Sequence, residues 1–300
     1  MPKLSFYLNK PANIGIALLI HFGGWLPDKQ YLKAMFRLKT GSKLNLKKPK
    51  TFAEKLQWLK LYDRKPIYHQ MVDKIDSKIL VNSILKEDRA VPTLAVYDSF
   101  EQIDWDALPQ QFVLKATHDS GSYYIVNDKN KVDKQDCKKH LYLHWNKELY
   151  RYTREWQYKG LKSRIIAEPL LASREKLREY KFFCFEGKPK MYQICIDRDP
   201  VLGSLLQMVD VEGNLLDIQD ASNDRVATNT VYKPRNLDKM LSIAKVMSKG
   251  MHFLRVDFYE TDDDFYLGEL TLHESAGYIT FKPDYWNKKL GSWIHLPIDE

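Results

Sequence analysis

The chain of 300 residues is long enough to bury a substantial core in two or three subdomains. Its 44% hydrophobic and 29% charged residues are typical of a globular protein, which excludes a disordered or low-complexity chain. The formal net charge of +8 favours anionic partners such as nucleotides, acidic glycans, phospholipid headgroups or nucleic acid, without choosing among them. Three widely spaced cysteines without a CxxC pair indicate neither a disulfide framework nor a zinc site, and they fit a reducing cytoplasm.

Residues 1–50 have a helical pattern and are predicted to form an N-terminal region of their own. Their apolar run, Ile14 to Ile20, is shorter than the roughly 20 apolar residues that cross a bilayer, so we expect a helix that packs on the body or rests on a partner. The basic stretch KLNLKKPK (Lys43 to Lys50) is predicted to be a solvated face or linker, although beside an apolar helix it could also contact anionic lipid. We expect a cytoplasmic protein. Peripheral contact with the inner face of the membrane, or with a glycan assembly complex, stays open.

Two amphipathic helices are predicted next. Thr51 and Glu54 form a capping box ahead of FAEKLQWLKLYDR, which is a strong signal for the start of a helix. A second helix follows Pro66, and its apolar side is predicted to carry Met71, Val72, Ile75, Ile79 and Leu80.

After Pro92 the pattern changes to strands. Phe112 to Ala116 and Tyr123 to Val126 are predicted strands joined by a polar loop, and a charged helix is predicted over roughly Lys134 to Tyr152. The next predicted strand, Arg164 to Leu171, is interrupted by Pro169 and is a plausible crossing between two lobes.

An aromatic cluster accompanies the predicted charged helix. It interleaves with two arginines, and its members are Trp145, Tyr150, Arg151, Tyr152, Arg154, Trp156 and Tyr158. Such a pattern can stack on nucleic acid or on sugar rings. Its apolar spacing favours packing with a basic outer face, so no nucleic-acid partner is expected.

The C-terminal part is predicted to be rich in strands, which makes the whole chain α+β. A hairpin is expected near Tyr180 to Phe185 and Lys190 to Ile196, and a helix from Asn236 to Lys249. A second hairpin is expected in FLRVDFYETDDDFYLGELTL, which starts at Phe253.

This second hairpin carries two carboxylates within apolar strands. With a turn of three residues at Asp262 to Asp264, Thr261 pairs with Phe265 and Asp257 lies opposite Glu269, on one face with Arg255 and Thr271. Opposed carboxylates about 5 Å apart repel by roughly 3 to 4 kcal/mol at an effective dielectric constant near 20. A hard divalent cation such as Mg²⁺ would relieve this repulsion. The alternative is a solvated acidic hairpin with another turn length, in which the two side chains never meet.

An ordered series of motifs resembles the TupA-like branch of the ATP-grasp enzymes, which is found in teichuronopeptide and other surface-polysaccharide biosynthesis. The series is TFAEKLQWLKLYDRKP, MVDK, VPTLAVYDSFEQIDWDALPQQFVLKATHDSGS, REWQYKGLKSRIIAEPLL, REYKFFCFEGKPK, FLRVDFY and LGELTLHESAGY, and it covers most of residues 45–290. The resemblance implies an ATP-grasp fold with two α+β lobes that grip ATP. It places a helical segment and the small lobe with the glycine-containing loop in 51–170, and the metal-binding lobe in 171–300.

The resemblance also implies a phosphate site. Lys74 and Lys115 match the two lysines that hold the phosphates of ATP, and Lys181 adds positive charge nearby. His118 to Ser122 match a flexible loop that closes over the phosphates. In this loop Gly121 permits a close approach of the backbone, and the amides with Ser120 and Ser122 can donate to phosphate oxygens.

Further implied residues concern adenine, ribose and metal. Pro169 would offer its carbonyl and Leu171 its amide to adenine, while Glu168 or Glu179 would reach the adenine amino group or the ribose. Asp257 and Glu269 match the magnesium ligands. Thr271 stands where many members have Asn, so the number of metal ions stays open. Arg255 would stabilise the anionic intermediate, which makes it a catalytic candidate beside Lys115.

The implied activity is an ATP-dependent ligation of surface-polysaccharide biosynthesis, which forms an amide through an acylphosphate. The expected partners are a carboxylate on an acidic glycan, sugar precursor, uronic acid or amino acid, and an amine. The usual α/β domain ahead of the lobes is replaced here by the short helical N-terminus, so acceptor recognition is expected to differ from that of better-known ligases. Two alternatives remain: a glycosyltransferase of a capsule or exopolysaccharide cluster, and a non-catalytic nucleotide- or glycan-binding module.

Overall fold

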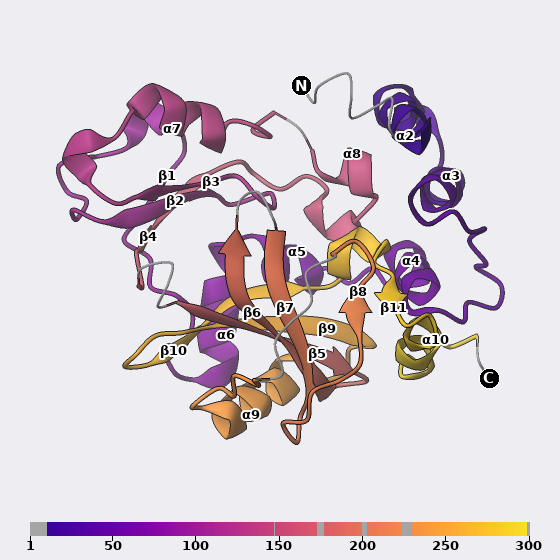
Figure 1. The fold of residues 1–300 in the computed structure, drawn as a ribbon. Coiled ribbons are helices and arrows are strands. Elements are labelled where there is room, and N and C mark those ends of the chain that lie inside the picture. Colours follow the sequence, from indigo (N-terminus) through magenta and orange to yellow (C-terminus); the bar gives the residue numbers. More distant parts are fainter. Residues whose placement is uncertain (1–10, 147, 173–176, 200–202, 224–229, 299–300) are drawn as a thin grey trace.

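The computed structural model describes residues 11–146, 148–172, 177–199, 203–223 and 230–298, and it has the predicted α+β architecture (Figure 1). A four-stranded sheet contains β1 (Ala95–Tyr97), β2 (Phe112–Ala116), β3 (Tyr123–Val126) and β4 (Ile165–Pro169). A five-stranded sheet contains β5 (Arg178–Phe185), β6 (Lys188–Asp199), β7 (Gly203–Asp210), β9 (Phe253–Glu260) and β10 (Phe265–Thr271). A small pair is formed by β8 (Gln219–Asp220) and β11 (Phe281–Lys282).

The four-stranded sheet has the order β1-β4-β2-β3, and all its neighbours are antiparallel. Side chains alternate along each strand, so Phe112 and Leu114 of β2 enter a core with α7 (Lys134–Leu141), which covers the sheet in Figure 1. The intervening Val113 and Lys115 point to the opposite face. The predicted strands at 112–116 and 123–126 are confirmed, and β4 ends at Pro169 as the predicted crossing to the second sheet.

The five-stranded sheet has the order β10-β9-β5-β6-β7, again antiparallel, and both of its faces are buried. Along β5, Phe182 packs into one core and Phe183 into the other. The first core lies under α5 (Ile67–Val72), α6 (Asp76–Leu85) and α9 (Leu237–Met247), and the second under α4 (Phe52–Tyr62) and α10 (Tyr285–Ser292). The predicted hairpin of β5 and β6 and the predicted helix at α9 are confirmed, whereas β7 was not predicted.

Helix α4 starts as the capping box predicts. The Thr51 side chain accepts from the Glu54 amide, and the Glu54 carboxylate accepts from the Thr51 amide at 3.0 Å. Helices α4, α5 and α6 all pack on the five-stranded sheet rather than on the four-stranded one. The segment 51–170 therefore contributes helices to the cores of the five-stranded sheet as well as all strands of the four-stranded one.

The single helix predicted after Pro66 is two helices, α5 and α6, with a break at Asp73 to Ile75. The short Asp73 side chain accepts from the amides of Ile75 (2.9 Å) and Asp76 (3.1 Å), so it competes with the helical backbone and starts α6. Ile79, predicted to be on the apolar side, is 66% exposed instead.

The charged helix predicted over 134–152 is also two elements. Helix α7 ends at Leu141, and α8 covers only Tyr150–Thr153 before Arg154 takes a left-handed conformation with φ of 56°. A residue other than glycine in the left-handed region costs conformational energy. The tertiary contacts of the Arg154 side chain therefore stabilise this backbone conformation.

At the N-terminus, α2 (Pro11–Phe22), the short 3₁₀ turn η1 (Gly23–Trp25) and α3 (Asp28–Thr40) form a helical hairpin beside α4 (Figure 1). Gly15 lies against Leu38 and Gly23 against Tyr31, so the two helices are antiparallel and closely packed. The described parts of the chain contain no helix with the length and apolar character needed to cross a bilayer.

Candidate active site

Glu168 links two lysines on the face of the four-stranded sheet that is turned away from α7. Its carboxylate lies 2.5 Å from the Nζ of Lys115 on the adjacent strand β2 and 2.7 Å from the Nζ of Lys78 on α6. Burial opposes ionisation of Glu168, but the two lysines outweigh it and keep its pKa below the ordinary range. Glu168 is thus the counterion of Lys115, which lies near the end of the otherwise apolar strand β2.

Lys74 lies in the break between α5 and α6, where its side chain turns back to the end of β2. Its Nζ donates to the carbonyls of Ala116 (2.7 Å) and Asp119, and its own amide donates to Thr117. Burial lowers the pKa of Lys74, while the charges of Asp119 and Glu269 oppose that shift. Carboxylates from both sheets therefore act on this one ammonium group.

Asp257 is fully buried in the middle of β9 and is neutralised by two cations. Arg255 Nε donates to Oδ1 at 2.7 Å and Nη2 to Oδ2 at 2.6 Å, and Lys181, directly opposite on β5, lies 3.3 Å away. Burial raises the pKa of Asp257, but Arg255 and then Lys181 outweigh it, so the carboxyl is held ionised. Protein cations therefore already neutralise Asp257, and the assignment of Asp257 and Glu269 as magnesium ligands stays a prediction.

The pairing of Asp257 with Glu269 is confirmed, but the register that was expected to produce it is not. Phe265 pairs with Glu260 rather than with Thr261, and a bulge between Leu267 and Glu269 then shifts the pairing by one residue. The two carboxylates differ in environment, since Asp257 is buried whereas the Glu269 side chain is 47% exposed. Arg255 Nη2 lies 3.9 Å from Glu269.

Other residues expected here lie on the same two strands or next to them. Thr271 is opposite Arg255, and its hydroxyl is buried without a hydrogen-bond partner within the described part of the chain. Glu179 is buried on β5 with Lys181 at 3.4 Å. Arg255, expected to be available to an intermediate, also donates from Nη1 to Glu274.

Only the tip of the glycine-containing loop is open. Ser120 and Gly121 are exposed, with Gly121 at φ of +101°, whereas His118, Asp119 and Ser122 are buried. The Ser122 hydroxyl donates to the Asp119 carboxylate, which also lies 3.1 Å from Nδ1 of His144. The base of the expected lid is therefore packed into the protein, and only its tip is free of such contacts.

The two sheets meet at Lys115 and Tyr259. Lys115 Nζ lies 5.9 Å from the centre of the Tyr259 ring on β9. On the same face of the small sheet, Val96, Ile166, Lys115 and Tyr123 form one cross-strand row, and Val113 and Ile125 begin the next. Val96, Tyr123 and Ile125 are 42, 52 and 43% exposed. Beside the lysines lies an open apolar surface of the kind that a flat aromatic base can cover.

A hollow of about 780 Å³ lies at the opposite end of β2 from Lys115. It is lined by Leu94, Pro109, Gln110, Gln111, Asn127, Asp128, Asn130, Pro169 and Leu170. The hollow therefore borders the segment expected to bind adenine, but it contains none of the charged residues described above. We place the candidate site at the charged cluster, because the ion pairs and the apolar face are there.

A model of the TupA-like ATPgrasp family matches residues 54–295. The chain belongs to the TupA-like ATP-grasp family. The match begins after the α2–α3 hairpin and contains both sheets, so the ATP-grasp fold expected from the resemblance is confirmed. No curated protein matches this chain.

Solved structures that are similar to this TupA-like protein come from ATP-grasp ligases. One is PsnB complexed with a minimal precursor, Mg and ADP (10% identity, 87% of this chain and 66% of that one, TM-score 0.40). Others are D-alanine–D-alanine ligases of Bacillus anthracis, complexed with ATP (14%, 67% and 53%, 0.39), and of Helicobacter pylori (14%, 81% and 69%, 0.41). This chain spans only about half to two thirds of the length of the first two.

The residues of the TupA-like protein fit ATP and Mg²⁺ in their chemistry. Lys74, Lys115 and Lys78 supply positive charge, and the carboxylates of Asp257 and Glu269, directly opposed, are oxygen ligands of the kind that Mg²⁺ takes. The unpartnered Thr271 hydroxyl adds another oxygen at the same edge. The described residues show no cluster of three or more His, Cys, Asp or Glu side chains that could hold a metal by themselves.

Sequence reasoning missed four polar residues of this site. Lys78 was hidden in a predicted continuous helix, and Asp119 was treated as a loop residue without a role. His144, 25 residues from Asp119, and Glu274, 19 residues from Arg255, are brought in by tertiary contacts. The alternation of β2 could have predicted the open apolar face, since Val113 and Lys115 must share it.

Proposed function

We propose that this protein is an ATP-dependent carboxylate–amine ligase of surface-polysaccharide biosynthesis. The observation that carries the proposal is the approach of Lys115 on the small sheet to β9 of the large sheet, which bears Asp257. The small lobe brings the positive charge of Lys115 and the large lobe brings the carboxylate of Asp257. Two lobes with such opposite charges at one place are suited to hold a nucleoside triphosphate between them. Membership of the ATP-grasp family supports the same conclusion.

In the proposed reaction, an oxygen of the substrate carboxylate attacks the γ-phosphorus of ATP and ADP leaves. The amine nitrogen then attacks the acyl carbon, inorganic phosphate leaves, and an amide and a proton are formed. Mg²⁺, when bound, would neutralise phosphate charge beside Asp257 and Glu269. The substrate carboxylate would belong to a uronic acid or an amino acid, and the positive net charge of the chain suits an acidic glycan or its precursor.

The lysines have separate tasks in this proposal. Lys115 and Lys74 contact the phosphates, with Lys181 beside Asp257 adding charge. Glu168 keeps Lys115 oriented while no phosphate is present, because its carboxylate is shared with Lys78. The exposed tip of the loop, Ser120 and Gly121, would close over the phosphates through its backbone amides.

Arg255 is assigned a double task. Three of its N–H groups are directed at Asp257 and Glu274, and a guanidinium has five, so two are left to donate to the acylphosphate. Adenine would cover the apolar face of Val113 and Ile125 and meet the Pro169 carbonyl and Leu171 amide. Glu179 would bind the ribose.

The test is incubation with ATP, Mg²⁺, a panel of uronic and amino acids, and hydroxylamine, which captures an activated acyl group as a hydroxamate. We expect hydroxamate and ADP to form only when the correct acid is present. Sugar transfer from a nucleotide-sugar, without ADP formation from ATP, would establish the glycosyltransferase instead. If the protein binds nucleotide without turning it over, and if Glu269→Ala leaves its function unchanged, it is a binding module.

A further inference from the structure

One face of α2 is apolar and open to solvent. Ile14, Leu18 and Phe22 are 45, 54 and 64% exposed, and their spacing of four residues puts them on one side of α2. Trp25, which is 81% exposed, follows three residues later in η1. Isolated exposed apolar residues are ordinary, but four large ones in a row are the mark of an interaction surface. This row lies outside the part of the chain that matches the family model.

The neighbouring helix α3 presents cations. Lys29, Lys33 and Arg37 are exposed and recur every four residues, whereas Tyr31 and Leu32 of the same helix are fully buried. Residues 11–50 contain eight Lys and Arg and one acidic residue, Asp28, so they carry +7 of the net +8 of the chain. Asp28 is itself engaged by Arg64 at 2.6 Å.

The apolar row and the cations lie on the same side of the hairpin. The contacts of Gly15 with Leu38 and of Gly23 with Tyr31 fix how the antiparallel helices face each other. Each residue of an α-helix is rotated by about 100° from the previous one. Counted from these contacts, the apolar row of α2 and the cations of α3 are both directed to the side opposite the buried face of α3. The surface therefore combines an apolar strip with a parallel row of positive charge.

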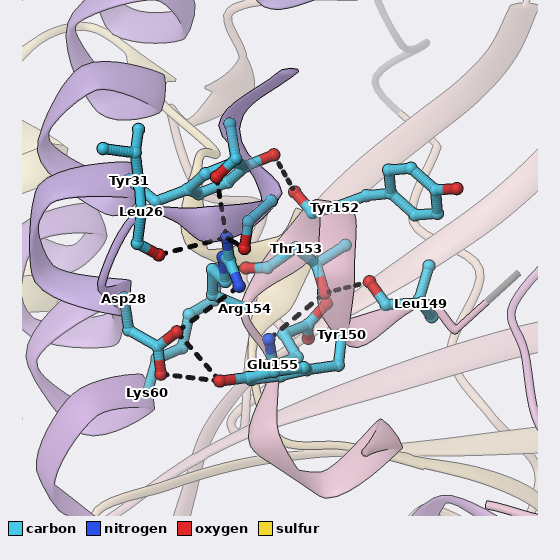
Figure 2. Close-up of polar contacts among 12 residues, drawn as sticks. Leu26, Asp28, Tyr31, Lys60, Leu149, Tyr150, Tyr152, Thr153, Arg154 and Glu155 are labelled. Atoms are coloured by element: carbon cyan, nitrogen blue, oxygen red, sulfur yellow. Dashed lines mark hydrogen bonds and ion pairs between the residues drawn. The ribbon is translucent and has the colours of Figure 1, made fainter. Parts of the chain in front are cut away.

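Polar contacts join the hairpin to the segment around α8, as Figure 2 shows. Arg154 donates to the carbonyls of Gly23 (3.1 Å) and Leu26 (3.4 Å), and its left-handed backbone directs it there. Tyr31 donates to the Tyr152 carbonyl at 3.1 Å, and Tyr150 donates to Asp28 at 2.8 Å. These contacts connect the hairpin to the part of the chain that matches the family model.

We propose that the α2–α3 hairpin binds the surface of an anionic phospholipid membrane. The apolar row would enter the boundary between headgroups and acyl chains, with Trp25 at the headgroup level, and Lys29, Lys33 and Arg37 would contact phosphates. Charge complementarity selects an anionic membrane over a neutral one, because the hairpin is almost free of carboxylates. The inference stands whether or not the protein is a ligase.

The test is co-sedimentation of the full chain with vesicles of phosphatidylcholine alone or of phosphatidylcholine and phosphatidylglycerol at a ratio of 3 to 1. We expect binding to the anionic vesicles, weakened by salt. The variant Leu18→Asn/Phe22→Asn is expected to lower the partition coefficient at least tenfold, which corresponds to about 1.4 kcal/mol. Lys29→Glu/Lys33→Glu is expected to do the same and to remove the dependence on salt.

Matched controls change the same residue types elsewhere. Val246→Asn on α9 removes an exposed apolar side chain, and Lys139→Glu on α7 reverses an exposed charge, so both are expected to bind vesicles as the unchanged protein does. Absence of vesicle binding would overturn the proposal, as would equal binding to neutral vesicles. If the protein does not bind vesicles but forms a dimer, and if Leu18→Asn/Phe22→Asn dissociates that dimer, the apolar face binds a second copy of the chain instead.

Discussion

Asp257 on β9 and Glu269 on β10 lie directly opposite each other because β10 contains one extra residue, Gly268, in a bulge between Leu267 and Glu269. The tip of the hairpin is in a different register, with Phe265 opposite Glu260. Without the bulge, Glu269 would not be opposite Asp257, and its side chain would leave the face that carries Arg255. The carboxylate pair thus depends on a glycine that has no charge of its own.

Gly268→Ala is expected to impair activity more than stability. An added Cβ would lie 2.3 Å from Cε2 of Tyr259, so the Tyr259 ring must move, and the centre of this ring lies 5.9 Å from Lys115 Nζ. Displacement of a site by about 1 Å costs up to about 100-fold in rate, so we expect kcat/KM for ATP to fall about 10- to 100-fold. Steady-state kinetics with thermal unfolding will measure both effects.

Two further variants make that prediction specific. A Cβ added at Gly24 would have no atom within 4 Å, so Gly24→Ala is expected to leave ATP kinetics unchanged. If the ring is the cause, Gly268→Ala adds little once Tyr259→Ala has removed the ring. Additive losses in the double variant would contradict this explanation.

Lys115→Ala is expected to lower ATP turnover by a factor on the order of 100 to 1,000, the loss typical for one electrostatic contact to a transition state. The fold should persist, because Glu168 keeps its second cation, Lys78, at 2.7 Å. Lys131→Ala, at a side chain that is 84% exposed, is the control. ADP release at the unchanged rate, with an intact thermal transition, would refute the assignment of Lys115.

Lys60 is expected to make stability depend on pH in the alkaline range. It is buried on α4, where its Nζ donates to Thr153 at 2.8 Å and to Ala276, and burial lowers its pKa from 10.5 to about 7, against the opposing charge of Glu155. Above pH 7 the unfolded chain therefore binds more protons than the folded one, so the free energy of unfolding rises with pH.

Urea denaturation at pH 7 and pH 9 measures this effect. From the two pKa values, Lys60 should contribute about 2 kcal/mol of added stability over this interval, at roughly 1.4 kcal/mol per pH unit once the folded lysine is neutral. Lys60→Met is expected to lack this gain. An equal rise in both proteins would place the titrating group elsewhere.

Thr51→Ala is expected to lower the free energy of unfolding by about 1 kcal/mol, because it removes the acceptor that caps α4. ATP turnover well below the melting temperature should not change, since Thr51 contacts no residue of the candidate site. Thr51→Ser keeps the hydroxyl and should restore most of the stability. A loss in Thr51→Ser as large as that in Thr51→Ala would show that packing, not capping, stabilises this helix.

Local patterns were sufficient for much of this protein. The capping box at Thr51, the strands around Lys115 and the two hairpins follow from spacing over a few residues, where alternation and hydrogen-bond geometry act directly. The ordered motifs were sufficient for the family as well. Prediction failed at two helix ends. The break before α6 depends on the Asp73 side chain, which accepts from nearby backbone amides in competition with the helix, and the end of α8 depends on Arg154, whose partners lie far away in the chain.

The sequence by itself determined the fold class, the family and the residue types of the candidate site, because these are properties of short segments and of their order. Only the tertiary structure decided the partners of each charge: Glu168 for Lys115, Arg255 and Lys181 for Asp257, and Lys78 as an added cation. It also decided that one face of α2 is left open beside the cations of α3. Electrostatic pairing and exposure depend on distances between segments far apart in the chain, and those distances exist only once the chain has packed.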